Sequence, residues 1–158
     1  MYKFLVVDDD ETLRTQICNM LQECEYEVMG AKYAAEAFSM LRNDLFDLVI
    51  AEIHMKDING VQLMQQIHEE FKLLPVILVS SDNRREVIMN AIKKGAQQVI
   101  WKDGITIDDF KNIWQYVILW RKKIYEQKGK AKQQVDLSPN QDLSVSSNED
   151  VSVSSDDE

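Results

Sequence analysis

The sequence contains few of the residues that mark secreted or membrane-spanning proteins. Only two of its 158 residues are cysteine and two are proline. Cys18 and Cys24 lie six residues apart in a segment with helical spacing, where neither a disulfide nor a metal pair is expected, and this favours a reducing compartment. The longest apolar runs, such as 48–51 and 76–79, are far shorter than the roughly 20 residues of a membrane span. Residues 2–7 also lack the pattern of a secretory signal. We therefore expect no membrane association and no export.

Basic residues are also scarce, because 18 Lys and Arg stand against 27 Asp and Glu, for a net charge of −9. Such a balance disfavours direct nucleic-acid binding, which needs cations to neutralise phosphates. Residues 129–158 hold two lysines and seven acids, which leaves −4 of the −9 for residues 1–128. Residues 129–158 are also rich in Ser, Gln, Asn and Asp and too poor in apolar residues to form a core. We predict a domain over 1–128 and a disordered acidic Ser-rich tail over 129–158.

Five short apolar runs recur at intervals of 21 to 28 residues, at 4–7, 27–30, 48–51, 76–79 and 99–101. Segments with helical spacing lie between them and after the last. Continuous apolar strands indicate a parallel sheet that is covered on both faces. The pattern predicts an α/β fold with a doubly wound (βα)5 parallel sheet. The last helix is expected from about 107 to 128, with Arg121, Lys122, Lys123 and Lys128 near its C-terminus, where cations suit the helix dipole.

Polar residues follow four of the predicted strands directly. They are Asp8, Asp9 and Asp10 after the first, Glu52 after the third, Ser80 and Ser81 after the fourth, and Lys102 after the fifth. The carboxyl ends of parallel strands share one edge of the sheet, where functional groups gather. Carboxylates, a hydroxyl and an ammonium group there suit a divalent cation and a phosphoryl group. Alternatively, the acidic run 8–11 only caps the following helix.

Several of these segments resemble the receiver domain of two-component response regulators. They are 3–10, 46–60, 74–80 and 94–96 together with Lys102, and the resemblance covers residues 2 to about 125. His54 and Met55 before Asp57, and residues 111–115, look most like plant type-B and pseudo-response regulators, which act in cytokinin or clock signalling. The resemblance implies a flavodoxin-like receiver fold, a signalling module that is not an enzyme, and a nuclear and/or cytoplasmic location.

The resemblance also implies site roles, which are carried over by position. Asp8 and Asp9 match the metal-binding acids, and the backbone carbonyl of His54 would complete a weak or vestigial Mg²⁺ site. Ser80 matches the switch hydroxyl and Lys102 the phosphate-pairing lysine. As side chains, His54 and His68 are expected to be ordinary residues rather than metal ligands.

The phosphoacceptor position falls on Glu52, where the family has aspartate. The added methylene moves the carboxylate by more than about 1 Å, a misplacement that can cost about a hundredfold in rate. Val99 occupies the aromatic switch position, and Asp103 replaces the proline after the lysine. A non-proline cis bond costs about 3–4 kcal/mol, so the Lys102–Asp103 bond is expected to be trans.

These departures predict a pseudo-receiver with little or no phosphotransfer, acting through protein–protein interaction. Two alternatives stay open. One is residual phosphoacceptor activity, and the other is a constitutive mimic in which Glu52 reaches Lys102 and Ser80 as a phosphoryl oxygen would. Expected partners are histidine phosphotransfer proteins or other response regulators, with a homo- or heterodimer formed through 84–128. A third possibility is an N-terminal part once joined to a DNA-binding module, although nothing after Lys132 resembles one.

The predicted tail contains four serines that stand three residues before an acid: Ser146, Ser147, Ser154 and Ser155. This spacing suits acidophilic kinases, although a Ser- and Asp-rich segment also generates such matches by chance.

Overall fold

The computed structural model describes the backbone of residues 1–137 and the side chains of residues 1–130. The chain divides into a compact unit of residues Met1–Arg121 and a second unit from Lys122 onward. The elements, in chain order, are β1 (Lys3–Val7), α1 (Glu11–Glu23), β2 (Glu27–Ala31), α2 (Ala34–Asn43), β3 (Leu48–Glu52), α3 (Gly60–Glu70), β4 (Val76–Ser80), α4 (Arg85–Lys93), β5 (Gln98–Trp101), a short 3-10 helix (Ile107–Asp109) and α5 (Trp114–Leu137).

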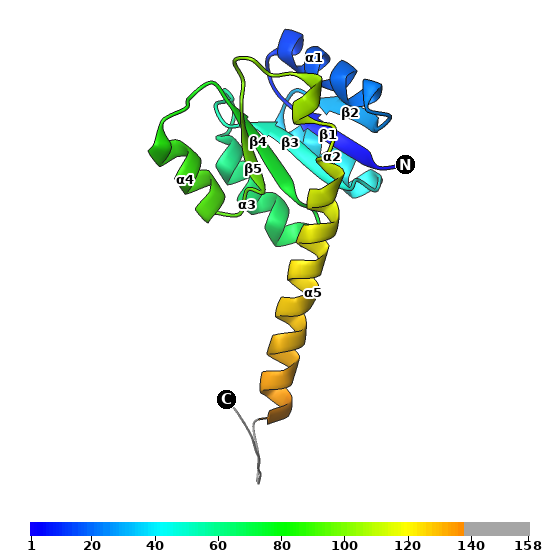
Figure 1. Cartoon of the computed structure of the whole chain (residues 1–158), viewed down its shortest axis with the longest axis vertical. Coiled ribbons are helices and arrows are strands. Elements are labelled where there is room, and N and C mark those ends of the chain that lie inside the picture. The colour runs from blue at the N-terminus through cyan, green and yellow to red at the C-terminus, as the bar shows by residue number, and fades with distance from the viewer. Residues whose placement is uncertain (138–158) are drawn as a thin grey trace. The chain divides into compact units, whose positions relative to one another are not determined.

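The five strands form one parallel sheet in the order β2-β1-β3-β4-β5. Figure 1 shows the labelled strands at the centre of the first unit, with helices around them. The predicted doubly wound (βα)5 fold is confirmed, and each predicted strand boundary lies within one residue of the observed one. The apolar runs located the strands well because every residue of β3 and β4 is buried.

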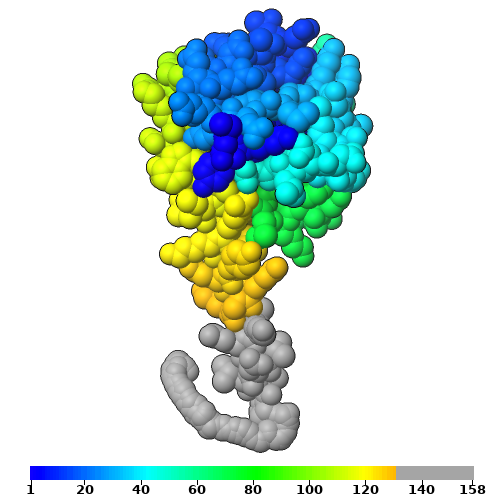
Figure 2. Space-filling model, turned by 90° about the vertical axis from the view of Figure 1, so that its right-hand side faces the viewer, coloured from blue at the N-terminus to red at the C-terminus, as the bar shows by residue number. Residues whose placement is uncertain are grey.

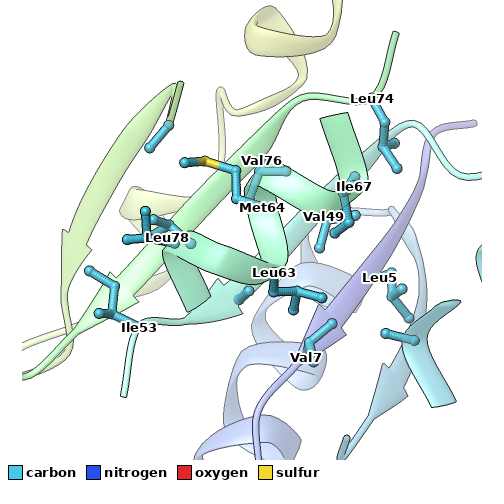
Figure 3. Packing of buried hydrophobic residues seen from close by; sticks show 14 of the residues in the cluster. Leu5, Val7, Val49, Ile53, Leu63, Met64, Ile67, Leu74, Val76 and Leu78 are labelled. Carbon is cyan, nitrogen blue, oxygen red and sulfur yellow. The ribbon is translucent and has the colours of Figure 1, made fainter. Parts of the chain in front are cut away.

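Each face of the sheet carries its own hydrophobic core, because successive strand residues point to opposite faces. On one face α3 packs against the sheet, and Figure 3 shows Leu63, Met64 and Ile67 facing strand residues such as Val49, Val76 and Leu78. The opposite core combines strand residues with α1, α5 and the 3-10 region: Phe4, Val6, Ile50, Ile77, Leu13, Ile17, Phe110, Ile113 and Val117. Each fully buried side chain of this size stabilises the fold by about 1.5–3 kcal/mol.

The last helix differs from the prediction at both ends. The segment from 107 begins as a 3-10 turn, closed by a capping box between Thr106 and Asp109, and the α-helix starts only at Trp114. It then continues to Leu137 and includes Gly129, which a helix interior tolerates at a cost of about 1 kcal/mol. The helix thus ends nine residues after the predicted Lys128, and its last turn carries no basic residue. The sequence predicts a disordered tail over 129–158. Residues 129–137 are instead part of α5, residues 138–158 lie outside the described residues, and the domain division at 128 stays a prediction.

The N-terminal strand is fastened at the edge of the sheet opposite the predicted site. The backbone N–H of Lys3 donates to Asp47 at 2.8 Å, and the Lys3 side chain pairs with Asp44. Figure 2 shows the N-terminal residues (dark blue) beside the part of the chain drawn in cyan, which includes the connection between α2 and β3. No helix among the described residues is long and apolar enough to cross a membrane.

Candidate functional site

Three buried polar or charged residues are found in the described part of the chain, and all lie at the carboxyl ends of neighbouring strands. Asp8 follows β1, Glu52 ends β3 and Ser80 ends β4, with 1%, 3% and 0% of their surface exposed. Burying such groups costs free energy unless they are paired. Their collection at one edge therefore marks a built site rather than an accident of packing.

Glu52 and Lys102 form an ion pair inside this site. Lys102 Nζ lies 2.8 Å from Glu52 Oε1, and the other carboxylate oxygen accepts the backbone N–H of His54 at 3.2 Å. Burial favours the neutral amine, but the hydrogen bond to Glu52 and the charges of Glu52 and Asp8 outweigh it and raise the pKa of Lys102. Both oxygens of Glu52 are therefore engaged within the protein.

The buried carboxylate of Asp8 is incompletely satisfied. Its Oδ1 accepts the backbone N–H of Asp10 at 2.9 Å, while its buried Oδ2 has no hydrogen-bond partner. Burial raises the pKa of Asp8 to about 6, and the negative charge of Glu52 adds to this effect. The hydrogen bond from the Asp10 N–H and the positive charge of Lys102 lower the pKa and offset part of the rise. Asp10 caps α1 by accepting from Leu13 N–H at 3.2 Å. The acidic run thus divides, because Asp10 caps the helix and Asp8 faces the site.

The acids partly fit a hard cation. The orphaned Oδ2 of buried Asp8 is a suitable oxygen ligand, and Mg²⁺ accepts few protein ligands when waters complete its shell. Asp9 Oδ2 already accepts the N–H of Lys56 at 2.8 Å. Within the described residues, no three His, Cys, Asp or Glu side chains are grouped to hold a metal ion. The arrangement therefore suits a weak site in which the buried Oδ2 of Asp8 is one ligand.

The hydroxyl of Ser80 is occupied by its own loop. It accepts the N–H of Asp82 at 2.9 Å and donates to the Asp82 carbonyl at 3.2 Å. The Asp82 carboxylate in turn accepts from Arg84, whose side-chain and backbone hydrogen bonds lower the pKa of Asp82 to about 2. The loop after β4 is thus closed on itself at the position that the resemblance assigns to the switch hydroxyl.

Strand β5, which ends directly before Lys102, has an exposed aromatic residue at an unexpected position. Val99, at the predicted switch position, packs partly buried against the α3 side of the core. Trp101, which lies two residues on and next to Lys102, is 50% exposed. No cis peptide bond occurs among the described residues, so the predicted trans Lys102–Asp103 bond is confirmed.

Sequence reasoning missed two residues that shape the loop between β3 and α3. A Cβ atom at Gly60 would lie 2.2 Å from the carbonyl oxygen of Glu52, so only glycine lets α3 begin this close to β3. Asp57 Oδ2 accepts the N–H of Ala34 at 3.0 Å, which caps α2 where Tyr33 offers no side-chain bond. The Asn59-Gly60 pair is a turn signal, but a cap supplied from 23 residues away has no local sequence signal.

Comparison with known families decides the classification. The model of the response regulator receiver domain matches residues 4–113. The chain belongs to this family. The resemblance noted for residues 2 to about 125 is therefore confirmed at the level of the receiver domain.

Similar curated proteins are plant response regulators. The two-component response regulator ORR21 of Oryza sativa subsp. indica is 41% identical over 128 residues, which cover 80% of this chain and 18% of that protein. The two-component response regulator ARR2 of Arabidopsis thaliana is 38% identical over 123 residues, covering 77% of this chain and 18% of that protein. The chain thus spans about a fifth of the length of these relatives.

Solved structures agree with the fold. The response regulator TrrA of Thermotoga maritima, in complex with Mg(2+)-BeF, is 26% identical with a TM-score of 0.65, covering 74% of this chain and 99% of that one. The beryllofluoride-activated NtrC4 receiver domain dimer is also 26% identical, with a TM-score of 0.68 and coverage of 74% and 96%. The flavodoxin-like receiver fold is therefore shown by both sequence and structure.

Proposed function

We propose that this chain is a pseudo-receiver of a plant phosphorelay, of cytokinin or clock type, that acts through protein contacts without accepting a phosphoryl group. The observation that carries the proposal is the 2.8 Å ion pair between Lys102 and Glu52. The family membership and the plant relatives support the signalling class.

The engagement of Glu52 argues against its use as a nucleophile. A receiver carboxylate needs a free oxygen in line with the phosphodonor, whereas both Glu52 oxygens accept hydrogen bonds from Lys102 and His54. The longer side chain also displaces the carboxylate, which lowers the rate of a positioned reaction steeply. Residual phosphoacceptor activity is therefore the weaker candidate.

The mimic interpretation has support from one of its two required contacts. Glu52 reaches Lys102, as a phosphoryl oxygen would. The Ser80 hydroxyl instead pairs with the backbone of Asp82, and Val99 leaves no aromatic switch on β5. These contacts favour a fixed module over one held permanently in a switched state.

A weak Mg²⁺ site is part of the proposal. Asp8, Asp9 and the backbone carbonyl of His54 would hold the ion, and the buried Oδ2 of Asp8 has no partner within the protein. When bound, the ion supplies charge neutralisation among the acids. Since the Glu52 carboxylate is already paired with Lys102, the ion would depend mainly on water and Asp8.

The partner surface that we propose lies within 84–128, on α4, β5 and the first turns of α5. Six of the large exposed apolar side chains belong to these three elements: Met89, Ile92, Trp101, Trp114, Ile118 and Leu119. Contiguous exposed apolar patches mark protein contacts, and we propose that these side chains supply one. Suitable partners are histidine phosphotransfer proteins or other response regulators, including a second copy of the chain, in the nucleus and/or cytoplasm.

The test is incubation of the full chain with acetyl phosphate and Mg²⁺, followed by intact mass. We expect no added phosphoryl group. The matched Glu52→Asp variant should gain a partial, hydroxylamine-labile adduct, which shows that the assay detects acceptors. A stoichiometric adduct at Glu52 in the unmodified chain would contradict the proposal.

A further inference from the structure

The basic residues of the last helix are not explained by its dipole. Residues 122–132 contain five lysines and one glutamate. A position near the helix C-terminus would account for them, but α5 continues to Leu137 and has no basic residue in its last turn. Figure 1 draws this part of α5 as one continuous helix (yellow to orange). The lysines therefore lie in the middle of the helix.

This helical segment is marginal by itself. The side chains of Lys122, Lys128 and Lys130 are exposed, and Gly129 interrupts the run of good helix formers. The single acid of this part, Glu126, lies at i, i+4 from Lys122 and from Lys130, and such a pair is worth only about 0.2–0.5 kcal/mol. Neutralising the lysines from outside the helix would therefore stabilise this segment.

The sequence that follows the helix has the opposite charge. Residues 138–158 contain six acids and no lysine or arginine. From Leu137 back to Lys122 the helix spans about 22 Å, at 1.5 Å per residue. An extended chain from Leu137 reaches about 40 Å by Glu149, at about 3.3 Å per residue. The acidic segment is therefore long enough to return along the whole basic part of α5.

We propose that the lysine-rich part of α5, residues 122–132, is a docking surface for the acidic segment 138–158 of the same chain. Opposite charge and direct covalent linkage both favour this occupant, because a short linker gives a high effective concentration. The contact shields the lysines from other polyanions and reduces their mutual repulsion. Since the charges are exposed, salt weakens it, with a screening length of about 10 Å at 0.1 M.

The experiment uses the full chain and a variant in which the six acids of residues 138–158 are changed to Asn or Gln. Backbone amide shifts and hydrogen exchange of residues 122–137 are compared at 50 and 500 mM salt. We expect shifts confined to this segment, about two- to fivefold faster exchange in the neutral variant, and the same change in the unmodified chain at high salt. The triple variant Lys122→Gln, Lys128→Gln and Lys130→Gln should change the amide shifts of residues 138–158, because it removes the charges that they contact. The matched control Lys56→Gln, Lys93→Gln and Lys94→Gln should leave those shifts unchanged.

Three outcomes would overturn the proposal. Identical amide shifts and exchange rates of residues 122–137 in the full chain and in the neutral variant would show that no contact forms. Shifts that depend on protein concentration would assign the lysines to the tail of a second copy. If the signals of residues 138–158 stay unchanged in the lysine variant, and a short DNA duplex shifts the amides of residues 122–137, the lysines serve an external polyanion instead.

Discussion

Lys102 Nζ and Glu52 Oε1 lie 2.8 Å apart at the carboxyl edge of the sheet, and Glu52 is only 3% exposed. By resemblance to receiver domains, we expect these to be the positions of the phosphate-pairing lysine and of the phosphoacceptor. Here the lysine is already paired with a carboxylate of the protein itself.

Removing the Glu52 charge should destabilise the chain. Glu52→Gln leaves a partly buried Lys102 without its counter-charge, which we expect to lower the free energy of unfolding by about 1–3 kcal/mol. Urea unfolding measures the change. In a double-mutant cycle with Lys102→Met, the second substitution should recover part of the loss, and strictly additive effects would show that the pair contributes no coupling.

Gly60 should not tolerate a side chain. Because its Cβ would lie 2.2 Å from the carbonyl oxygen of Glu52, Gly60→Ala must push α3 away from β3. We expect a loss of about 2–4 kcal/mol in urea unfolding, as for other overpacked sites. Gly104→Ala is the matched control, since that site has a positive φ of 80° but open space, and should cost only about 1–2 kcal/mol. Equal losses would contradict the steric explanation.

His68 should make stability depend on pH. Its ring stacks on Trp120 with centroids 4.7 Å apart, and burial lowers its pKa below 6.5, partly offset by the Leu74 backbone. Between its two pKa values His68 binds more protons in the unfolded chain, so its contribution to stability rises with pH towards 6.5 and falls on acidification. His68→Gln should flatten this slope between pH 5 and 7 in urea unfolding. A slope that persists in His68→Gln would assign the pH dependence to other groups.

Magnesium should bind weakly and through Asp8. Titration into the millimolar range should shift the amide resonances of Asp8, Asp9 and Glu52, because the free Oδ2 of Asp8 is a suitable ligand. Asp8→Asn should abolish these shifts. Asp44→Asn, which changes an acid at the opposite edge of the sheet, should retain them. Shifts that persist in Asp8→Asn would place the ion elsewhere.

Four serines of the segment outside the described residues should accept phosphate. Ser146, Ser147, Ser154 and Ser155 each precede an acid by three residues, and each phosphate adds about −1.5 to −2 charges at pH 7. An acidophilic kinase should modify the full chain, as measured by intact mass and fragmentation. Replacing the four serines with alanine should prevent this, and phosphate found only within residues 1–121 would show that the spacing arises by chance.

The sequence alone was sufficient for the sheet and for the edge at which the site lies. Apolar runs such as 48–51 and 76–79 are buried on both faces, so hydrophobicity locates them without reference to the rest of the chain. Parallel topology then fixes that Asp8, Glu52 and Lys102 emerge at one edge. The receiver resemblance added their family roles but no contacts.

Only the tertiary structure decided how the groups at this edge are paired. Loop conformations determine three of these contacts. They are the hydrogen bond between Ser80 and Asp82, the cap of α2 by Asp57, and the close approach of α3 to Glu52 at Gly60. The helix end at Leu137 likewise escaped prediction, since Gly129 and a change of composition suggested an earlier stop. The periodic pattern of apolar residues predicts which side chains are buried, because hydrophobicity is a property of each side chain by itself. Hydrogen-bond partners and helix ends depend instead on the free-energy balance among segments that meet only in the folded chain.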